Sequence, residues 1–370
     1  MIKILRSLSI SLLFGFLLGF AACTNDPVIV GPPEPPPPPP PEWTVTPEAD
    51  VYIVGGHNMV MKNGKIIHYL EKGDFPMCAN QVFVYGGDVY VAGHRLDNDK
   101  QLASLWKNGV LQPLELFYTD NPNHLSSAIS VFVSDDNVYV AGYQSGSNGF
   151  SVATLWVNGV PTSLSDPDTD SYLAEARSVF VSDGDVYVGG YEGFYYGIVW
   201  KNGEVLRRYR YYGGAPNNQT CIKSVFVSGG DVYAAGTDWI GVSRAILWKN
   251  DEPHLFGLGS PGSVFVSGDD VYVGGSKVAD QNDILSAGFK NYAVLWKNGI
   301  EHRLTNGEGY ASVYSISVSG DNFYFAGPQY DSPNSAKSNS IIWVNGEAIR
   351  LEPYGFTGRT TSVYAVSKTE

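Results

Sequence analysis

The sequence predicts an all-β fold in which a unit of four strands is repeated seven times. A strand-like segment of the form Asp-Val-Tyr-Val-Ala-Gly recurs along the chain, and its copies begin at Asp50, Asp88, Asn137, Asp185, Asp231, Asp270 and Asn322. Each copy is followed by a second landmark, typified by "LWKNG" at residues 105–109. The 42 glycines and the hydrophobic fraction of 44% in 370 residues suit tight turns and a sizeable core.

The strands of one unit follow each other as a meander. "SVFVS" at residues 224–228 is the expected first strand, and "DVYAAG" at residues 231–236 is the second, with a Gly-Gly turn between them. "AILWK" at residues 245–249 is the third strand, and an Asn turn leads to the fourth. Because such units recur every 38–52 residues, the pattern predicts β-propeller blades. A β-sandwich is the competing all-β fold, but it gives no reason for the repetition.

The two ends of the repeat region predict how the ring closes. Residues 49–56, "ADVYIVGG", begin with the second strand of a unit, whereas residues 361–370, "TSVYAVSKTE", contain a first strand with nothing after it. We therefore expect residues 45–370 to form a seven-bladed propeller in which the C-terminal strand completes the first blade. This closure leaves no exposed sheet edge at the seam.

The amino terminus predicts export and a lipid anchor. Residues 1–22 contain a basic start, an apolar run and then small residues directly before Cys23. This layout resembles a bacterial lipoprotein signal, which implies that Cys23 is lipidated and that the protein is attached to the outer membrane or cell surface of a Gram-negative bacterium. The alternative is an ordinary secretory signal with a chance cysteine. Residues 23–44 are proline-rich and predict a stiff tether.

The net charge limits which partners the protein is expected to bind, and the positions of the cysteines predict their redox state. The net charge of −13 becomes −15 when residues 1–22, which carry Lys3 and Arg6, are removed. This acidic balance argues against nucleic acid and against electrostatic binding to anionic lipid, so the membrane contact is expected through the lipid anchor only. Cys78 and Cys221 occupy the same repeat position in units far apart around the ring, so we expect two free thiols. We expect a monomer without cofactor or metal.

The units look like extracellular propeller repeats of the kelch-like and HAF-type kind, whose "LW-x-x-G" turn is similar to "LWKNG" here. The resemblance covers residues 50–370. The paired glycines and the spaced Trp and Tyr of true kelch blades are not reproduced. Since such families include binding proteins and enzymes, the resemblance implies the fold and not an activity.

The expected binding site lies where the units differ from each other. The segments between second and third strands are long and diverse, and we expect them as loops on one face. The candidate ligand-binding residues are His94, Tyr143, Tyr191, Tyr195 and Trp239 on this face, with Arg177 and Lys223 on inner strands at the channel entrance. The aromatic residues suit stacking on sugar rings or anchoring a protein. Alternatively, they pack the loops down, and Arg177, Lys223 and Glu175 are a salt-bridged scaffold. The six tryptophans of the "LW" landmark are expected in the core.

No catalytic motif was recognised. The sequence lacks a phosphate-binding glycine loop, a zinc-binding His pair and a G-x-S-x-G elbow. The leading hypothesis is a membrane-anchored extracytoplasmic binding protein for a glycan or a protein. The alternative is a carbohydrate-active enzyme, a glycosidase or lyase with two carboxylates facing each other across the channel mouth. A purely structural role is the third possibility.

Overall fold

The computed structural model describes residues 48–55, 58–71, 75–98, 100–117, 124–146, 149–166, 173–193, 196–210, 219–239, 241–279, 290–331, 338–356 and 358–368. The expected signal, the lipid attachment residue Cys23 and the expected tether lie outside the described residues.

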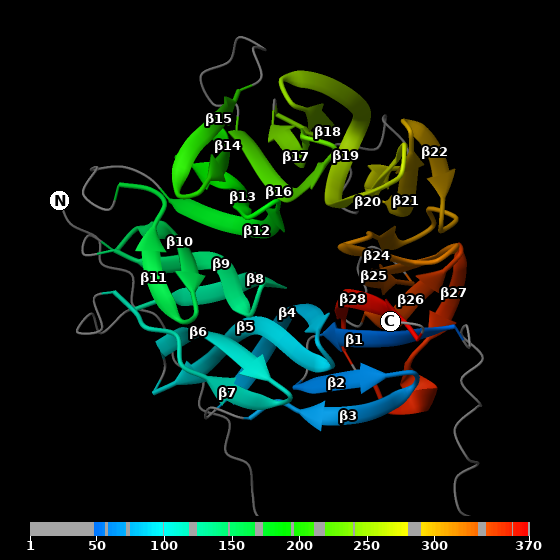
Figure 1. The fold of residues 1–370 in the computed structure, drawn as a ribbon. Coiled ribbons are helices and arrows are strands. Elements are labelled where there is room, and N and C mark those ends of the chain that lie inside the picture. The colour runs from blue at the N-terminus through cyan, green and yellow to red at the C-terminus, as the bar shows by residue number, and fades with distance from the viewer. Residues whose placement is uncertain are drawn as a thin grey trace, which may run out of the picture. The chain divides into compact units, whose positions relative to one another are not determined.

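Four sheets of the repeat region contain four strands each, and each sheet is an antiparallel meander (Figure 1). The first consists of β28 (Thr360–Ser367), β1 (Ala49–Gly55), β2 (Met59–Lys62) and β3 (Lys65–Tyr69). The second consists of β4 (Phe75–Tyr85), β5 (Asp88–Asp97), β6 (Lys100–Lys107) and β7 (Val110–Gln112). The third consists of β8 (Ser126–Ser134), β9 (Asn137–Ser145), β10 (Ser151–Val157) and β11 (Val160–Ser163), and the fourth of β12 (Ala174–Ser182), β13 (Asp185–Glu192), β14 (Tyr196–Lys201) and β15 (Glu204–Tyr209).

The remaining twelve strands form one sheet, in which three further meanders follow each other. The strands are β16 (Gln219–Ser228), β17 (Asp231–Trp239), β18 (Ser243–Lys249), β19 (Glu252–Ser267), β20 (Asp270–Val278), β21 (Asn291–Lys297), β22 (Ile300–Arg303), β23 (Tyr310–Ala311), β24 (Ser315–Ser319), β25 (Asn322–Tyr330), β26 (Asn339–Val344) and β27 (Glu347–Arg350). β22 and β24 branch off the main path, with β22 paired to β21 and β24 to β25. β19 joins two meanders because its first half pairs with β18 and its second half with β20. A 3₁₀ turn, Glu352–Tyr354, follows β27. The all-β prediction is confirmed.

The two landmarks of the repeat meet at one turn. Asn63 and Gly64 have φ angles of 48° and 74°, as a two-residue hairpin turn requires. The Asn63 Oδ1 accepts a hydrogen bond from the Val51 amide, and its Nδ2 donates to Asp50. Lys62 forms an ion pair with the same carboxylate at 2.6 Å. The arrangement recurs at Asp88, Asp185, Asp231 and Asp270 with their lysines.

This turn also explains the two exceptions in the sequence. In the third and seventh units, Asn137 and Asn322 replace the aspartate, and Val157 and Val344 replace the lysine. The asparagine of the turn still donates to residue 137 or 322 in these units. The negative and positive partners are therefore present together or absent together.

The core lies between neighbouring sheets, as expected for blades. One cluster combines Val54 and Val60 of the first sheet with Val82, Val91 and Trp106 of the second. The six landmark tryptophans are at most 5% exposed, and Met61, fully buried, takes their place in the first unit. The prediction that these tryptophans are core residues is confirmed.

The second and third strands extend into the segments that were predicted to be long loops. β5 continues to Asp97 and β6 begins at Lys100, so the predicted loop after Gly93 is wrong. The glycine interrupts the apolar alternation, but the backbone pairing continues past it, with His94 opposite Ala103. Tyr143 and Tyr191 are likewise strand residues, in β9 and β13.

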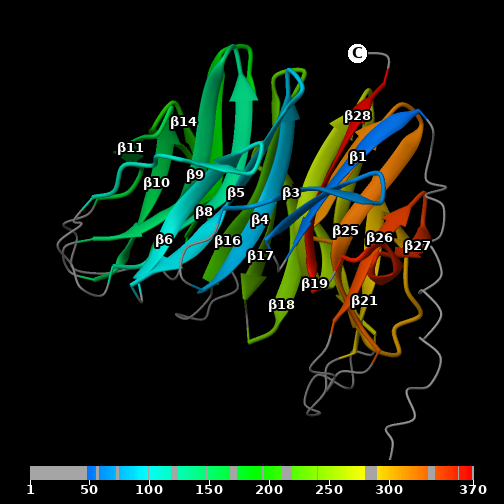
Figure 2. The same cartoon turned by 90° about the horizontal axis from the view of Figure 1, so that it is seen from below.

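The C-terminal strand pairs with the first strand of the described chain. β28 runs antiparallel to β1, with Val363 opposite Ile53, and Figure 2 shows the two strands side by side. Val363 is 2% exposed and belongs to the same core cluster as Ile53. The two ends of the repeat region therefore share one sheet.

Candidate functional site

A cavity of about 810 Å³ is lined by the first strands of the meanders. Figure 1 shows that these strands lie on the inner side of their sheets. The lining of the cavity comes from β4, β8, β12, β16, β19, β24 and β28, one strand from each repeat unit, together with a few flanking residues. Its volume falls in the range of small-molecule sites. The repeat thus places the same strand of every unit at one shared space.

Six of the seven first strands carry an irregularity where they meet this cavity, and in the seventh unit Tyr314, directly before β24, takes the equivalent position. The strand pairing skips one residue, as between Ala176 and Ser178 and between Ile222 and Ser224. Such a bulge re-aims the extra side chain away from the regular ladder. The residues at the equivalent position are Asn80, Ile129, Arg177, Lys223, Gly262, Tyr314 and Thr361, and all of them line the cavity. We call these seven positions the bulge ring.

The constant glycine of the second strand accompanies the bulge. A Cβ added to Gly190 would stand 2.0 Å from the carbonyl oxygen of Glu175, two residues before the bulge residue Arg177. The equivalent glycines 55, 93, 142, 236, 275 and 327 meet the equivalent carbonyl at 1.8 to 2.3 Å. Only glycine leaves room for this close approach. The repeated "AG" or "GG" is therefore explained by the bulge as well as by strand packing.

Side-chain hydrogen bonds connect neighbouring first strands directly after the bulge. The Ser130 hydroxyl accepts from the Val179 amide, Ser178 from Val225 and Ser224 from Val264. The same relation links Gln81 to Val131, Ser362 to Val82 and Ser315 to Val363. These amides lie on edge strands, where a ladder partner is missing on one side. The serine of "SVFVS" thus satisfies the edge of the next unit.

An aromatic collar lines the cavity two residues further along. Its members are Phe83, Phe132, Phe180, Phe226, Phe265 and Tyr364, and the seventh unit has Ser317 at this position. Neighbouring ring centroids lie 4.4 to 5.1 Å apart, in tilted contacts. Since tilted aromatic pairs are favourable, the collar stabilises the inner edge of the sheets. The polar bulge ring and the apolar collar make the cavity chemically asymmetric along the strands.

Positive charge collects at one side of the bulge ring. Arg177 forms an ion pair with Glu175 at 2.7 Å and lies over the ring of Tyr191, with 5.5 Å between guanidinium carbon and ring centroid. The Lys223 Nζ donates to the Ser260 Oγ at 2.6 Å. Arg359 also lines the cavity. Glu175 is the one carboxylate among the described lining residues, so the cavity carries a positive excess in an acidic protein.

Burial and neighbouring charges shift the pKa values of Lys223 and Tyr191. Burial, followed by repulsion from Arg177, holds the pKa of Lys223 below its usual range. Burial and the Glu175 carboxylate raise the pKa of Tyr191. By exposed surface, Lys223 and Arg177 are each half-buried.

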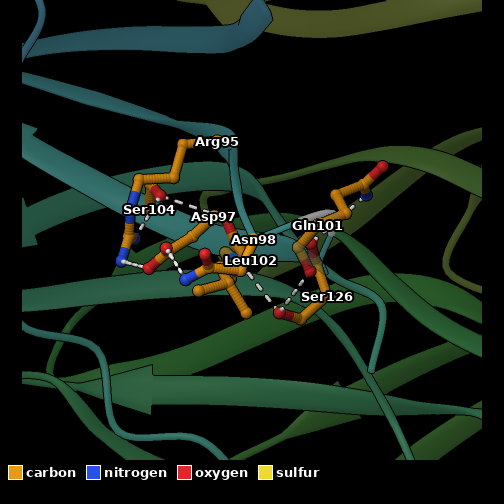
Figure 3. A network of polar contacts seen from close by, with 8 residues as sticks. Arg95, Asp97, Asn98, Gln101, Leu102, Ser104 and Ser126 are labelled. Atoms are coloured by element: carbon orange, nitrogen blue, oxygen red, sulfur yellow. Dashed lines mark hydrogen bonds and ion pairs between the residues drawn. The ribbon is translucent and has the colours of Figure 1, made fainter. Parts of the chain in front are cut away.

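The sheets that precede the Arg177 sheet are polar and aromatic where they line the cavity. The His94 Nδ1 lies 3.2 Å from the Ser127 Oγ, and burial lowers the pKa of His94, which favours the neutral imidazole. The Gln101 Nε2 donates to the Tyr143 hydroxyl at 3.2 Å and to the carbonyl of Ser126. Figure 3 shows Gln101 beside Ser126, near the end of the β5–β6 hairpin. Tyr143 is therefore held by the neighbouring sheet.

The same network fixes the tip of this hairpin. Arg95 donates to Ser104 at 3.1 Å and pairs with Asp97 at 3.6 Å, and Asn98 donates to Asp97 (Figure 3). The Ser126 Oγ accepts from the Ala103 amide, which ties β6 to β8. Residues that the sequence analysis assigned to a loop are thus part of an ordered sheet extension.

The structure brings together four of the predicted ligand-binding residues: His94, Tyr143, Arg177 and Lys223 all line the cavity. The ring of Tyr191 lies against the Arg177 guanidinium. Trp239 lies at the end of β17, is 48% exposed and does not line the cavity. Tyr195 lies outside the described residues. The ion pair that the scaffold hypothesis expected exists for Arg177, whereas no carboxylate of the described residues pairs with Lys223.

Sequence reasoning missed Asn80, Tyr314, Thr361 and Arg359 as cavity residues. The first three precede the serine, or the glutamine in its place, of the first strand. This position varies between units, whereas the residue after it is a serine in six of the seven units. That contrast was available in the sequence and marks the bulge ring. Arg359 lies before the C-terminal strand and had no counterpart in a pattern.

Both described cysteines are free, as predicted. In the strand register, Cys78 lies opposite His94 and Cys221 lies opposite Thr237. The two cysteines therefore occupy the same position in their units. Burial raises the pKa of each thiol. In the part of the chain that is described, no group of three or more His, Cys, Asp or Glu side chains is placed to hold a metal.

No protein-family model and no curated protein matches the sequence. Among solved structures, YjhT is 14% identical with a TM-score of 0.41, over 76% of this chain and 98% of that chain. The extracellular domain of BT4673 from B. thetaiotaomicron is 10% identical with a TM-score of 0.42, over 76% of this chain and 37% of that chain. A thermostable family-43 glycoside hydrolase is 12% identical with a TM-score of 0.37, over 65% of this chain and 96% of that chain.

These TM-scores lie below 0.5, so the propeller-like architecture rests on the strand pairing and the repeat. The resemblance to kelch-like and HAF-type repeats stays a prediction. Within the described residues, no helix has the length and apolar character needed to cross a bilayer.

Proposed function

We propose that this protein is a lipid-anchored extracytoplasmic binding protein that takes up a glycan in its central cavity. The observation that carries the proposal is the bulge ring. The seven positions present six different side chains and one glycine to one space, on a frame whose turns, glycines and tryptophans repeat. Packing alone favours the same residue in every unit, as the collar illustrates. Variation at an inward-facing position supports recognition.

We infer that the units form seven blades closed by β28. Six hydrogen bonds of one kind run from unit to unit around the cavity, including the bonds from the seventh to the first unit and from the first to the second. The pairing of β28 with β1 supplies the missing inner strand. A closed ring gives the bulge ring a rigid frame, which reduces the ordering cost of binding.

The chemistry of the lining suits a glycan. Hydroxyl, amide and imidazole groups of Asn80, Ser127, Tyr143 and His94 can exchange hydrogen bonds with sugar hydroxyls. Glycosidases in general use two carboxylates, one as acid and one as base or nucleophile. Among the described lining residues the single carboxylate, Glu175, is paired with Arg177. This arrangement supports binding over the alternative of a carbohydrate-active enzyme.

The anchor is tested separately from the cavity. Cys23→Ser removes the expected acylation site, so the variant should be released into the periplasm or the medium without detergent. Continued need for detergent would overturn the lipid-anchor proposal and leave the cavity proposal untouched.

A glycan array with two single variants tests the site. Tyr314→Ala removes a bulge-ring side chain, whereas Trp239→Ala removes an exposed ring outside the cavity. We expect the first variant to lose binding at least tenfold and the second to bind as the parent does, with melting temperatures near that of the parent. The opposite pattern would move the site to the loop face that the sequence analysis proposed. Release of reducing ends from a bound glycan would establish the enzyme.

A further inference from the structure

We propose that Lys223, with Arg177 beside it, binds the acidic group of a short acidic saccharide, a uronate carboxylate or a sulfate ester. The inference rests on the proposed function and specifies its ligand. Both residues belong to the bulge ring and come from neighbouring sheets, at β16 and β12. They therefore present two cationic groups to one side of the cavity.

The Lys223 ammonium has no carboxylate partner among the described residues. An ammonium has three N–H donors, and Ser260 accepts one of them. No carboxylate among the described residues pairs with this ammonium, whereas every lysine of the surface turns has an aspartate. A half-buried cation without a counter-charge is less favourable in the empty protein than one that is paired. An anion from the ligand would supply the missing partner.

Arg177 is only partly satisfied by its neighbours. Glu175 neutralises Arg177 through one terminal nitrogen, yet the buried Nε of Arg177 has no hydrogen-bond acceptor in the described residues. Tyr191 covers one face of the guanidinium, so the group is held in place. A planar guanidinium with a free donor edge is suited to carboxylate and sulfate oxygens. The lysine and the arginine thus offer complementary donors to one oxyanion.

The charge of the cavity is opposite in sign to the net charge of the protein. The protein has 37 acidic and 24 basic residues. The cavity reverses this balance, because Lys223 and Arg359 remain after Glu175 and Arg177 cancel. An acidic surface repels anionic ligands in general, so a positive cavity selects those small enough to enter. Hydroxyl-binding groups on the preceding sheets, at Tyr143 and His94, suit the sugar part of such a ligand.

The experiment compares matched ligands and matched variants by calorimetry. The ligands are glucuronate- and galacturonate-terminated di- and trisaccharides, their neutral parents with CH₂OH in place of the carboxylate, sulfated disaccharides, and inorganic sulfate and phosphate. The variants are Lys223→Met and Lys249→Met. Lys249 is the control because the same charge is removed from a surface turn outside the cavity.

We expect an acidic saccharide to bind at least tenfold more tightly than its neutral parent, since hydrogen bonds to charged groups are the strong ones. Lys223→Met should remove this preference, so that an acidic saccharide binds no more tightly than its neutral parent, while Lys249→Met should leave the preference intact. The carboxylated and sulfated members identify which acidic group is bound.

Three results would overturn the inference. If the neutral parents bind as tightly as the acidic saccharides, or if Lys223→Met keeps the preference, the oxyanion site is wrong and glycan binding stands. If inorganic sulfate or phosphate alone reproduces the full affinity, the ligand is a simple anion and not a saccharide. If no saccharide of either kind binds, the inference fails together with the proposed function.

Discussion

The carbonyl oxygen of Glu175 lies 2.0 Å from the point where a Cβ on Gly190 would stand. This contact fixes the position of the backbone two residues before Arg177, which the bulge directs into the cavity. A glycine in the second strand and a functional residue in the first strand are therefore structurally coupled.

Gly190→Ala should disrupt the bulge of its sheet. The methyl group cannot fit against a backbone carbonyl, so we expect a loss of about 3 kcal/mol or more in the free energy of unfolding. Gly149→Ala is the control, because Gly149 has a φ of 82° and open space around it. It should cost only the strain of a left-handed residue, about 1–2 kcal/mol. Denaturant melts measure both, and equal losses would show that the carbonyl contact is unimportant.

A second glycine contact predicts coupling between sheets. A Cβ on Gly189 would lie 2.8 Å from the Cγ2 of Ile222 on the neighbouring sheet. Where the second unit has Ala92 at this position, the facing residue is the smaller Ala128 in the same core cluster. Gly189→Ala should cost about 1–3 kcal/mol, and the loss in the Gly189→Ala, Ile222→Ala double variant should be smaller than the sum by about 1 kcal/mol. Strict additivity would contradict the packing.

The surface turns predict loss of stability in acid. Hydrogen bonds from Lys297, Asn298 and Tyr272 hold the pKa of Asp270 at about 2, below the ordinary value of 3.8 for an aspartate. Because the folded-state pKa is the lower one, the contribution is present above the unfolded value and is lost as the pH falls from about 4 towards 2. The Asp270→Asn, Lys297→Val variant reproduces the pair found at Asn137 and Val157. Its urea midpoint should fall less than that of the parent over this pH range, and equal slopes would exclude the ion pair as a cause.

Removal of residues 362–370 should unfold the repeat region. The deletion takes away most of β28, which buries Val363 and Ala365 and accepts the Val82 amide through Ser362. We expect the cooperative thermal transition to be lost or lowered by tens of degrees, whereas removal of residues 369–370 alone should leave it unchanged. If the longer deletion melts within a degree or two of the parent, the ring is closed elsewhere.

The repeat and the turns were readable in the sequence because their residues are locally required. An Asn-Gly turn needs positive φ angles, and Trp106 or Trp156 fills one buried site per sheet. The bulge was not readable in this way, since it is a register shift between two strands. His94 and Tyr143 were chosen correctly as candidates but were placed in loops, because the apolar alternation ends at the glycine before them.

The charged side of the cavity was only half predictable. The salt bridge between Glu175 and Arg177 follows from their spacing on one strand. That Lys223 approaches Arg177 but finds no carboxylate depends on which sheets are neighbours, which is a property of the assembled fold. Trp239, an attractive candidate by residue type, lies apart from this space.

The bulge ring separates two tasks that proteins commonly solve with the same residues. The turns, tryptophans and glycines hold the sheets together, whereas the bulge positions differ from unit to unit. Three of these positions also serve the frame. Asn80 and Thr361 donate to carbonyl oxygens of the neighbouring sheet, and a Cβ on Gly262 would stand 2.2 Å from the Val313 carbonyl oxygen. Substitution at the other four positions, Ile129, Arg177, Lys223 and Tyr314, therefore alters recognition with less effect on the frame. For a protein engineer, these four positions are a compact library site.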